Sequence, residues 1–323
     1  MTSREKVLKF IQERGSLSAN ELSESLSLSR QMIHKLLRDL VQANKIEKIG
    51  RAPKTVYQLK PNIPTSDVVV RPEQEKFLQE NFLLITETGE IKEGKEGFNL
   101  WCIQRKLPFE KTVEEFISTY RKYNAYRSQY EVIDGMEKLR GTKYETVHLD
   151  HLFYLDFYAI ERFGKTRLGT ILHYAKQGQS KLLMKQLVAE TKERVEKVCE
   201  LVNADAVGFI PPTIRREVQL MKYLQTHYNL NLPIVKINKT SGIIPVPQKS
   251  LNKLEERVAN ARKTFSIPEP RTFNHILLID DAVGSGATVN EVAGKIKKKG
   301  LAKEVSALAI TGSFKGFDVI TDV

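Results

Sequence analysis

Two adjacent acidic residues in the C-terminal half of the sequence are its best candidates for chemistry. Asp280 and Asp281 follow an apolar run and precede a turn of small residues, which consists of Gly284, Ser285, Gly286, Ala287 and Thr288. Carboxylates accept hydrogen bonds from hydroxyl groups, and backbone amides at the start of a helix bind phosphate. The two features together predict a sugar-phosphate site, with the acids on ribose hydroxyls and the turn on the phosphate.

The flanking residues indicate the elements that must position this site. Residues 276–279 are all apolar, which is typical of a buried parallel strand, and a helical pattern begins at Val289. Acids at the carboxyl end of a strand lie where open α/β sheets bind ligands. Many α/β proteins contain a strand, a glycine turn and a helix without such a site, so the pattern remains a hypothesis. The turn is not a P-loop, because no Lys-Ser/Thr pair follows the glycines, and it lacks the GxGxxG spacing of a dinucleotide site.

This stretch resembles the phosphoribosyl-pyrophosphate (PRPP) loop of type I phosphoribosyltransferases. The resemblance implies that PRPP binds, with Mg²⁺, at Asp280, Asp281, Ala282, Val283, Gly284, Ser285, Gly286, Ala287 and Thr288. Gly284 and Ser285 stand where the family usually has Thr, which removes one hydroxyl donor. No residue is predicted to be a catalytic acid, base or nucleophile.

Composition and charge narrow the class of protein. The 323 residues suffice for two or three domains, and the apolar fraction of 41% is that of a soluble globular protein. No apolar run approaches the length of about 20 residues that a membrane helix needs, so we expect cytoplasmic residence and no membrane partner. Only two cysteines occur, which excludes a disulfide framework and a four-cysteine zinc site. The net charge of +12 favours a polyanionic partner, although excess lysine also serves solubility.

Residues 1–60 have the order of a winged helix-turn-helix. Ser3, the capping box Ser18-x-x-Glu21 and Ser29 each open a predicted helix, and two short strands follow, at residues 46–49 and 55–59. This segment holds 12 basic and 6 acidic residues. It resembles the DNA-binding domain of winged-helix transcription regulators, in which the third helix enters the major groove. The residues predicted to contact DNA are Arg30, Gln31, His34, Lys35 and Arg38 of the third helix, and Arg51 and Lys54 of the hairpin turn. Winged helices also serve as protein-interaction modules, which is the alternative.

A linker and a middle region with no recognisable chemistry follow. Residues 61–72 contain Pro61, Pro64 and Pro72 without hydrophobic periodicity, so they predict a stiff linker. Residues 73–150 are predicted to be mostly helical. Their tyrosines at 120, 123, 126 and 130 interleave with basic residues, a mixture that can stack nucleic-acid bases, but a packed amphipathic helix is the preferred interpretation.

From residue 151 to residue 323, strands alternate with helices. Predicted strands at residues 206–210, 233–237, 276–279 and 305–310 are separated by helices, which indicates a parallel α/β sheet with right-handed crossovers. We therefore expect a multidomain chain, with an N-terminal winged helix and a C-terminal phosphoribosyltransferase-like sheet.

Residues 155–312 also resemble the ComF family of phosphoribosyltransferase-like proteins. The likeness rests on the strand that ends at Pro211-Pro212, on the helix pattern Gln248, Leu251, Arg257, Asn260 and Phe265, and on an earlier helix with Arg167, Lys176 and Gly178. The four-cysteine zinc knuckle with which many ComF proteins begin is absent, so no zinc is expected. The related fold places its pyrophosphate loop just after a strand end, which makes Arg215 and Arg216, and more weakly Lys239, candidates for pyrophosphate binding. The alternative for the two arginines is a solvated pair at the start of a helix.

Three functions remain open. The sequence favours a DNA-binding regulator whose C-terminal domain binds PRPP or a ribose-phosphate nucleotide. The first alternative is an active transferase that passes phosphoribose from PRPP to an acceptor and releases pyrophosphate. The second alternative is a ComF-like accessory in DNA uptake or processing, which rests on family likeness alone. The sequence leaves a homodimer open.

Overall fold

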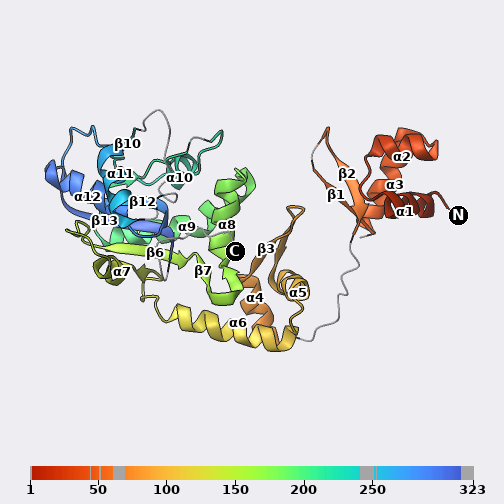
Figure 1. The fold of residues 1–323 in the computed structure, drawn as a ribbon, viewed down its shortest axis with the longest axis horizontal. Helices are drawn as coiled ribbons and strands as arrows, with labels where there is room; N and C mark the ends of the chain where they lie inside the picture. Colours follow the sequence, from red (N-terminus) through yellow and green to blue (C-terminus); the bar gives the residue numbers. More distant parts are fainter. Residues whose placement is uncertain are drawn as a thin grey trace. The chain divides into compact units, whose positions relative to one another are not determined.

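The computed structural model describes residues 2–43, 45–50, 52–60, 70–214, 216–240, 251 and 253–313. The chain divides into two compact units, one of residues 1–69 and 86–90 and one of residues 70–85 and 91–323. Figure 1 traces both units. No helix of the described residues is long and apolar enough to cross a membrane.

The first unit is a three-helix bundle with a two-stranded wing. Its elements are α1 (Ser3–Arg14), α2 (Ala19–Leu26), α3 (Arg30–Gln42), β1 (Ile46–Ile49) and β2 (Val56–Leu59). The wing strands are antiparallel, and Leu17, in the segment between α1 and α2, forms an isolated antiparallel bridge with Tyr57 of β2. The N-cap of α1 is Thr2, which forms a capping box with Glu5, so the expectation that Ser3 caps this helix is wrong by one residue.

The core of this unit is formed by residues that the helical periodicity places inward. Val7, Leu22 and Ile33 are fully buried, and they pack with residues of α3 and β1. Met32, an apolar residue next to Ile33 for which the helical periodicity also predicts an inward position, is instead 42% exposed. It lies at the edge of the apolar stripe, where one residue step along the helix turns a side chain by about 100°.

The second unit begins with a helical segment around an aromatic core. Its elements are α4 (Pro72–Asn81), β3 (Leu83–Ile85), β4 (Ile91–Glu93), α5 (Gly94–Gln104) and α6 (Phe109–Asn124). Phe98 stacks on Trp101, and Phe116 packs between Phe98 and Phe163. α4 starts at the last residue of the predicted linker, because Pro72 occupies the first turn of the helix, where its missing N–H costs nothing. The rest of the predicted linker lies mainly outside the described residues.

A five-stranded sheet dominates the remainder of this unit. Its strand order is β5-β6-β13-β12-β9, with β5 (Ile133–Asp134), β6 (Leu152–Phe157), β9 (Ala206–Phe209), β12 (Phe273–Val283) and β13 (Ala302–Gly312). The four longer strands are parallel, as predicted, and β5 is an antiparallel edge strand. β5 precedes residue 151, so the sheet reaches into the predicted middle region.

Helices cover both faces of the sheet, and the side chains of β12 alternate between them. Leu277 and Ile279 face α8 (Arg167–Gln177), α9 (Lys181–Leu201) and α10 (Leu220–Tyr228). Ile276 and Leu278 face the opposite layer, which contains α7 (Met136–Gly141), α11 (Leu254–Thr264) and α12 (Ala287–Lys298) (Figure 1). Two short antiparallel pairs complete the described part. β7 (Ala159–Ile160) and β8 (Gly164–Lys165) form a hairpin around the 3₁₀ turn η1 (Glu161–Phe163), and β10 (Asn238–Lys239) pairs with β11 (Phe265–Ser266), which follows α11.

The predicted strand at residues 233–237 is reduced to a single bridge. Ile234 pairs with Val207 of β9, on the side of β9 that faces away from β12. Pro233 has no N–H to extend the ladder. The chain therefore leaves β9, crosses one face through α10 to this bridge, and returns across the other face through α11 to β12. Strands β9 and β12 flank the point where the winding reverses, and open α/β sheets bind ligands at such a point.

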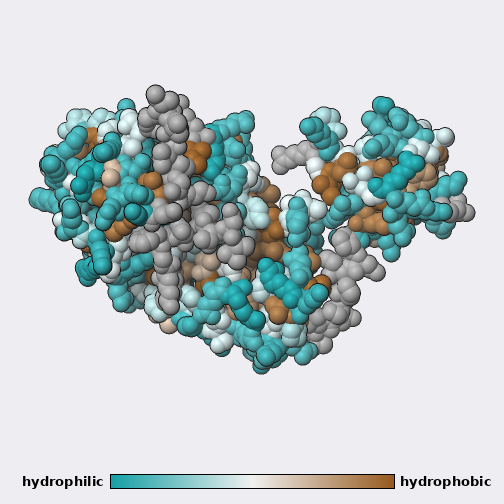
Figure 2. Space-filling model, viewed as in Figure 1, coloured by the Kyte–Doolittle hydropathy of each residue, from teal (hydrophilic) through white to brown (hydrophobic). Residues whose placement is uncertain are grey.

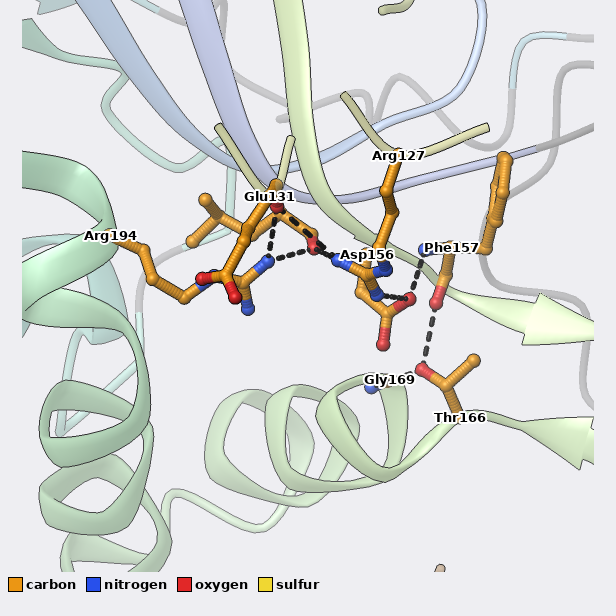
Figure 3. A network of polar contacts seen from close by, with 8 residues as sticks. Arg127, Glu131, Asp156, Phe157, Thr166, Gly169 and Arg194 are labelled. Atoms are coloured by element: carbon orange, nitrogen blue, oxygen red, sulfur yellow. Dashed lines mark hydrogen bonds and ion pairs between the residues drawn. The ribbon is translucent and has the colours of Figure 1, made fainter. Parts of the chain in front are cut away.

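A buried charge network joins the segment after α6 to the sheet (Figure 3). Arg127 donates to Asp156 Oδ1 at 2.6 Å and to the carbonyl oxygen of Leu155 at 2.6 Å, while Arg194 of α9 donates to the carbonyl oxygen of Glu131 at 2.9 Å. Burial raises the pKa of Asp156, and burial lowers the pKa of Arg194. Tyr120 packs against Phe77 with ring centroids 5.4 Å apart. Arg127 and Tyr120 thus serve packing, as the preferred interpretation had it, although Tyr126 and Tyr130 are about half exposed, at 48% and 51%.

Candidate functional site

The two acids lie at the carboxyl end of β12, beside the winding reversal. Asp281 is buried, and Lys176 from the last turn of α8 contacts both of its carboxylate oxygens, at 2.8 and 2.6 Å. Asp280 accepts a hydrogen bond from the backbone N–H of Asp281 at 2.8 Å. The apolar run before them continues the parallel ladder with β9 and β13, which fixes both side chains on a rigid strand.

The electrostatics of this pair differ between its two members. Burial, followed by the charge of Asp281, raises the pKa of Asp280 well above its usual range, while Lys176 and Lys239 act in the opposite direction. Two carboxylates on adjacent residues repel each other, so the pair holds a proton more readily than either acid alone. Lys176 is the counter-ion that keeps Asp281 compatible with burial.

The turn after the acids leads directly into α12. Gly286 is the N-cap of α12 with φ +90° and ψ −1°, a left-handed conformation that favours glycine. The N–H of Asn290 donates to the carbonyl oxygen of Gly286 at 2.9 Å, which starts the helix, and the amides of the first turn have no partner within the helix. Tyr144 donates its hydroxyl to the carbonyl oxygen of Ser285 at 3.0 Å and so holds the turn in place.

Ala282 and Val283, which were predicted to bind PRPP, are the last two residues of strand β12. They pair with Thr311 and Gly312 of β13, and Val283 is 3% exposed within the hydrophobic core. The apolar run at residues 276–279 marks only the middle of β12, since the ladder with β13 carries the strand past the two acids. The turn itself therefore consists of Gly284, Ser285 and Gly286, and Ala287 and Thr288 form the start of α12.

Two of the cations predicted to bind pyrophosphate, Lys239 and Arg216, have defined contacts near the acids. Lys239 of β10 donates to Thr213 Oγ1 at 2.6 Å, and its ammonium lies 4.5 Å from the ring centroid of Phe265. Burial lowers the pKa of Lys239 to about 8, while the charge of Asp280 acts to raise it. Arg216 donates to Gln177 Oε1 at 2.8 Å. α10 begins only at Leu220, so Arg216 lies in the loop before the helix and not at its start. Arg215 lies outside the described residues.

The fold brings together residues that are far apart in the sequence. Lys176 from α8, Thr213 from the loop after β9, Lys239 from β10 and the acids of β12 all gather at the carboxyl edge of the sheet. Sequence reasoning named Lys176 only as part of the ComF-like helix pattern, and its pairing with Asp281 was not foreseen. The other two members of that pattern lie elsewhere: Arg167 bonds Glu93 and Glu190, and Gly178 is the C-cap of α8.

Two further residues of the ComF-like pattern are placed by their contacts. Arg257 is buried, and its Nε donates to the carbonyl oxygen of Leu251 at 2.6 Å, so it links its helix to the neighbouring loop. Phe265 lies under the ammonium of Lys239. Gln248 lies outside the described residues.

The second candidate site is the exposed face of α3 in the first unit. The five residues predicted to reach DNA from this helix are all exposed; they are Arg30, Gln31, His34, Lys35 and Arg38. Ser29 caps the helix by accepting from the N–H of Met32 at 3.3 Å. Lys54 of the hairpin turn is exposed as well, and Arg51 lies outside the described residues. Figure 2 shows hydrophilic residues over much of the visible surface of this unit.

Comparison with known proteins decides the nature of the first unit. Residues 2–47 match the family model of winged helix-turn-helix DNA-binding domains. The match spans all three helices and the start of β1. The chain thus carries an N-terminal DNA-binding domain and a separate α/β unit. A search of the curated proteins found no match to the chain.

Proposed function

We propose that this protein is a DNA-binding regulator whose α/β unit is phosphoribosyltransferase-like and binds PRPP or a ribose-phosphate nucleotide. One observation carries the ligand part. An acid pair, a turn that opens a helix, and Lys176 and Lys239 meet at the carboxyl edge of the sheet, beside the winding reversal between β9 and β12. A ribose phosphate offers hydroxyl donors to the acids and phosphate oxygens to the amides and cations.

The charge balance of the site fits an anionic ligand with a metal ion. Lys176 and Lys239 offset the two acids, and Arg216 adds positive charge nearby. Mg²⁺ binds through one or two carboxylates together with phosphate oxygens, and Asp280, which Lys176 does not contact, is the carboxylate suited to this. When bound, the ion would neutralise charge on the diphosphate. Lys239 and Arg216 would hold the diphosphate, and Asp281 would orient the ribose.

Titration calorimetry with PRPP and Mg²⁺ tests the ligand assignment. We expect the wild-type chain to bind and the double variant Asp280→Asn/Asp281→Asn to bind at least about tenfold more weakly, because hydrogen bonds to charged groups contribute about 1.5–3 kcal/mol. Glu304→Gln is the matched control, since Glu304 is an exposed acid that pairs with His275 on the same sheet. If the double variant and the wild type bind PRPP with equal heats and affinities, Asp280 and Asp281 are not part of the ligand site.

The DNA-binding part is tested through the recognition helix. Arg30→Ala/Arg38→Ala should abolish specific DNA binding. The double variant should also reduce the slope of log affinity against log salt concentration, because fewer phosphate contacts form and fewer counter-ions are released on binding. Lys9→Ala is the control, because Lys9 is exposed on α1 and pairs with Glu13. Unchanged DNA binding in the double variant would move the interface away from α3.

The cations opposite the acids favour a second candidate, an active phosphoribosyltransferase. Lys239 and Arg216 stand where departing pyrophosphate would gain from positive charge, and the acids would stabilise the ribose as charge develops at its C1 atom. The discriminating experiment incubates the chain with PRPP, Mg²⁺ and a panel of nucleobases and follows pyrophosphate release. Sustained release with one base would defeat the interpretation of the unit as a sensor alone. A ComF-like role in DNA handling rests on the sequence likeness only.

A further inference from the structure

Helix α7 and the residues that follow it pack against the turn that precedes α12. A Cβ added to Gly286 would lie 2.6 Å from Leu139 Cδ1, so α7 packs against the turn as closely as a glycine allows. Tyr144, three residues after the end of α7, donates to the carbonyl oxygen of Ser285. This short stretch belongs to the predicted middle region, in which the sequence showed no chemistry.

Lys138 lies on the same helix and reaches the carboxyl edge of the sheet. Its ammonium donates to the carbonyl oxygen of Ser313 at 2.9 Å and also to the hydroxyl of Ser313. The N–H of Ser313 in turn donates to the carbonyl oxygen of Val283 at 3.2 Å. Ser313 follows the last residue of β13, and Val283 is the last residue of β12, immediately before the turn. The ammonium is therefore one hydrogen-bonded residue away from the strand end that leads into the turn.

The positive charge of Lys138 is not balanced within the described part of the chain. Its recorded partners are the two oxygens of Ser313, both neutral, and burial lowers the pKa of Lys138 to about 8. Holding a partly buried ammonium against neutral oxygens costs free energy. A nearby anion would recover that cost. The N-terminus of α12, where backbone amides have no partner within the helix and the helix dipole is positive, is a place that favours such an anion.

We propose that Lys138 binds the phosphomonoester of a ribose phosphate that is held by the turn at residues 284–288. This inference rests on the proposed ligand site and deepens it, because it divides the cations between two ends of the ligand. Lys138 and the turn amides take the phosphomonoester, whereas Lys239, Arg216 and Lys176 serve the diphosphate and the acid pair. The ligand class is then a ribose with a phosphate at the Lys138 end, and inorganic pyrophosphate alone does not need Lys138.

The test compares two probes by titration calorimetry, ribose 5-phosphate and inorganic pyrophosphate with Mg²⁺. Lys138→Gln should weaken the binding of ribose 5-phosphate about tenfold or more, which is the range for loss of a charge-assisted hydrogen bond. The same variant should change the affinity for pyrophosphate by less than about threefold, the size expected for a charge that does not contact the ligand. Lys143→Gln is the matched control, because Lys143 is exposed five residues further along the chain. It should leave both affinities unchanged.

A second variant guards against loss of the fold. Lys138→Arg keeps the charge and should retain ribose 5-phosphate binding. Wild-type binding at pH 8, measured in buffers with different ionisation enthalpies, should take up protons as the ligand draws a proton onto Lys138, and Lys138→Arg should reduce this uptake because arginine stays protonated.

Two outcomes would overturn the inference, and they are distinguishable from failure of the ligand site itself. If the wild type binds ribose 5-phosphate and Lys138→Gln binds it equally well, Lys138 has no role while the site stands. If Lys138→Gln weakens both probes equally, the division of the cations is wrong. If the wild type binds neither probe, the proposed ligand site itself is wrong, and the role of Lys138 falls with it.

Discussion

The ion pair between Lys176 and Asp281 makes a stability prediction that depends on pH. Lys176→Met removes the cation that contacts both oxygens of Asp281, with side-chain exposures of 22% for the lysine and 8% for the acid. Breaking a fully buried pair costs about 3–5 kcal/mol, and the partial exposure of Lys176 lowers this to about 2–3 kcal/mol of unfolding free energy near pH 8. The loss arises because buried Asp281 has no counter-ion in the variant while a second acid, Asp280, lies beside it.

The sign of the pH dependence follows from Asp280. Burial and the charge of Asp281 raise its pKa above the unfolded value, so the folded state keeps a proton that the unfolded chain has already released. Stability contributed by this group therefore falls as pH rises from about 4, the unfolded pKa, through the raised folded pKa. Lys176 lowers the pKa of Asp280, so removing it makes the fall larger and extends it to higher pH.

Urea unfolding followed by Trp101 fluorescence measures this effect. Trp101 is the only tryptophan of the chain and is buried in the second unit, so its signal reports that unit. The control is Lys192→Met, which breaks an exposed pair with Glu196 at 3.8 Å and should cost less than about 1 kcal/mol at any pH. The reasoning is refuted if Lys176→Met loses as much stability at pH 5 as at pH 8, or no more than the control.

Three further predictions concern the same edge of the sheet. Gly286→Ala should destabilise the second unit by more than about 1–2 kcal/mol, the cost of a left-handed backbone, because the added Cβ would also meet Leu139. The control Gly300→Ala measures the backbone cost alone, because Gly300 has φ +66° and open space around it. Equal losses of stability in the two variants would contradict the close packing of α7 on the turn. Pyrophosphate affinity should fall between pH 7 and pH 9 as Lys239, whose pKa burial lowers to about 8, loses its charge; Lys239→Arg should flatten that fall, and an unchanged profile would remove Lys239 from the site. Tyr144→Phe should weaken PRPP binding several-fold by freeing the turn while leaving DNA binding intact, and calorimetry beside a DNA-binding assay separates the two.

Local pattern in the sequence predicts the elements that carry local signals. The capping box at Ser18 and Glu21 and the apolar stripe of α3 are short-range features, and the winged helix follows from them. The strand, acid pair and glycine turn of the second unit are equally local, and the structure has them in that order.

The parts that the sequence missed depend on tertiary pairing. α7 is six residues long and carries no periodicity strong enough to mark it, so Lys138 gave no signal. The strand expected at residues 233–237 is a single bridge, because only the edge of β9 is available to it. The lengthening of β12 through Val283 comes from the ladder with β13, which no local pattern of residues 280–283 reveals. Lys176 and Asp281 are 105 residues apart, and only the fold shows that they meet.

The central claim is that Asp280 and Asp281 accept hydrogen bonds from the hydroxyl groups of a ribose. The alternative is that the site binds anions through its cations alone. The variant Asp281→Asn, titrated with PRPP and with inorganic pyrophosphate in the presence of Mg²⁺, tests it most directly. Removing this negative charge beside Lys176 should leave pyrophosphate affinity equal or higher, whereas PRPP loses a charged acceptor. We therefore predict that the ratio of PRPP affinity to pyrophosphate affinity falls about tenfold or more. An unchanged ratio would contradict the account.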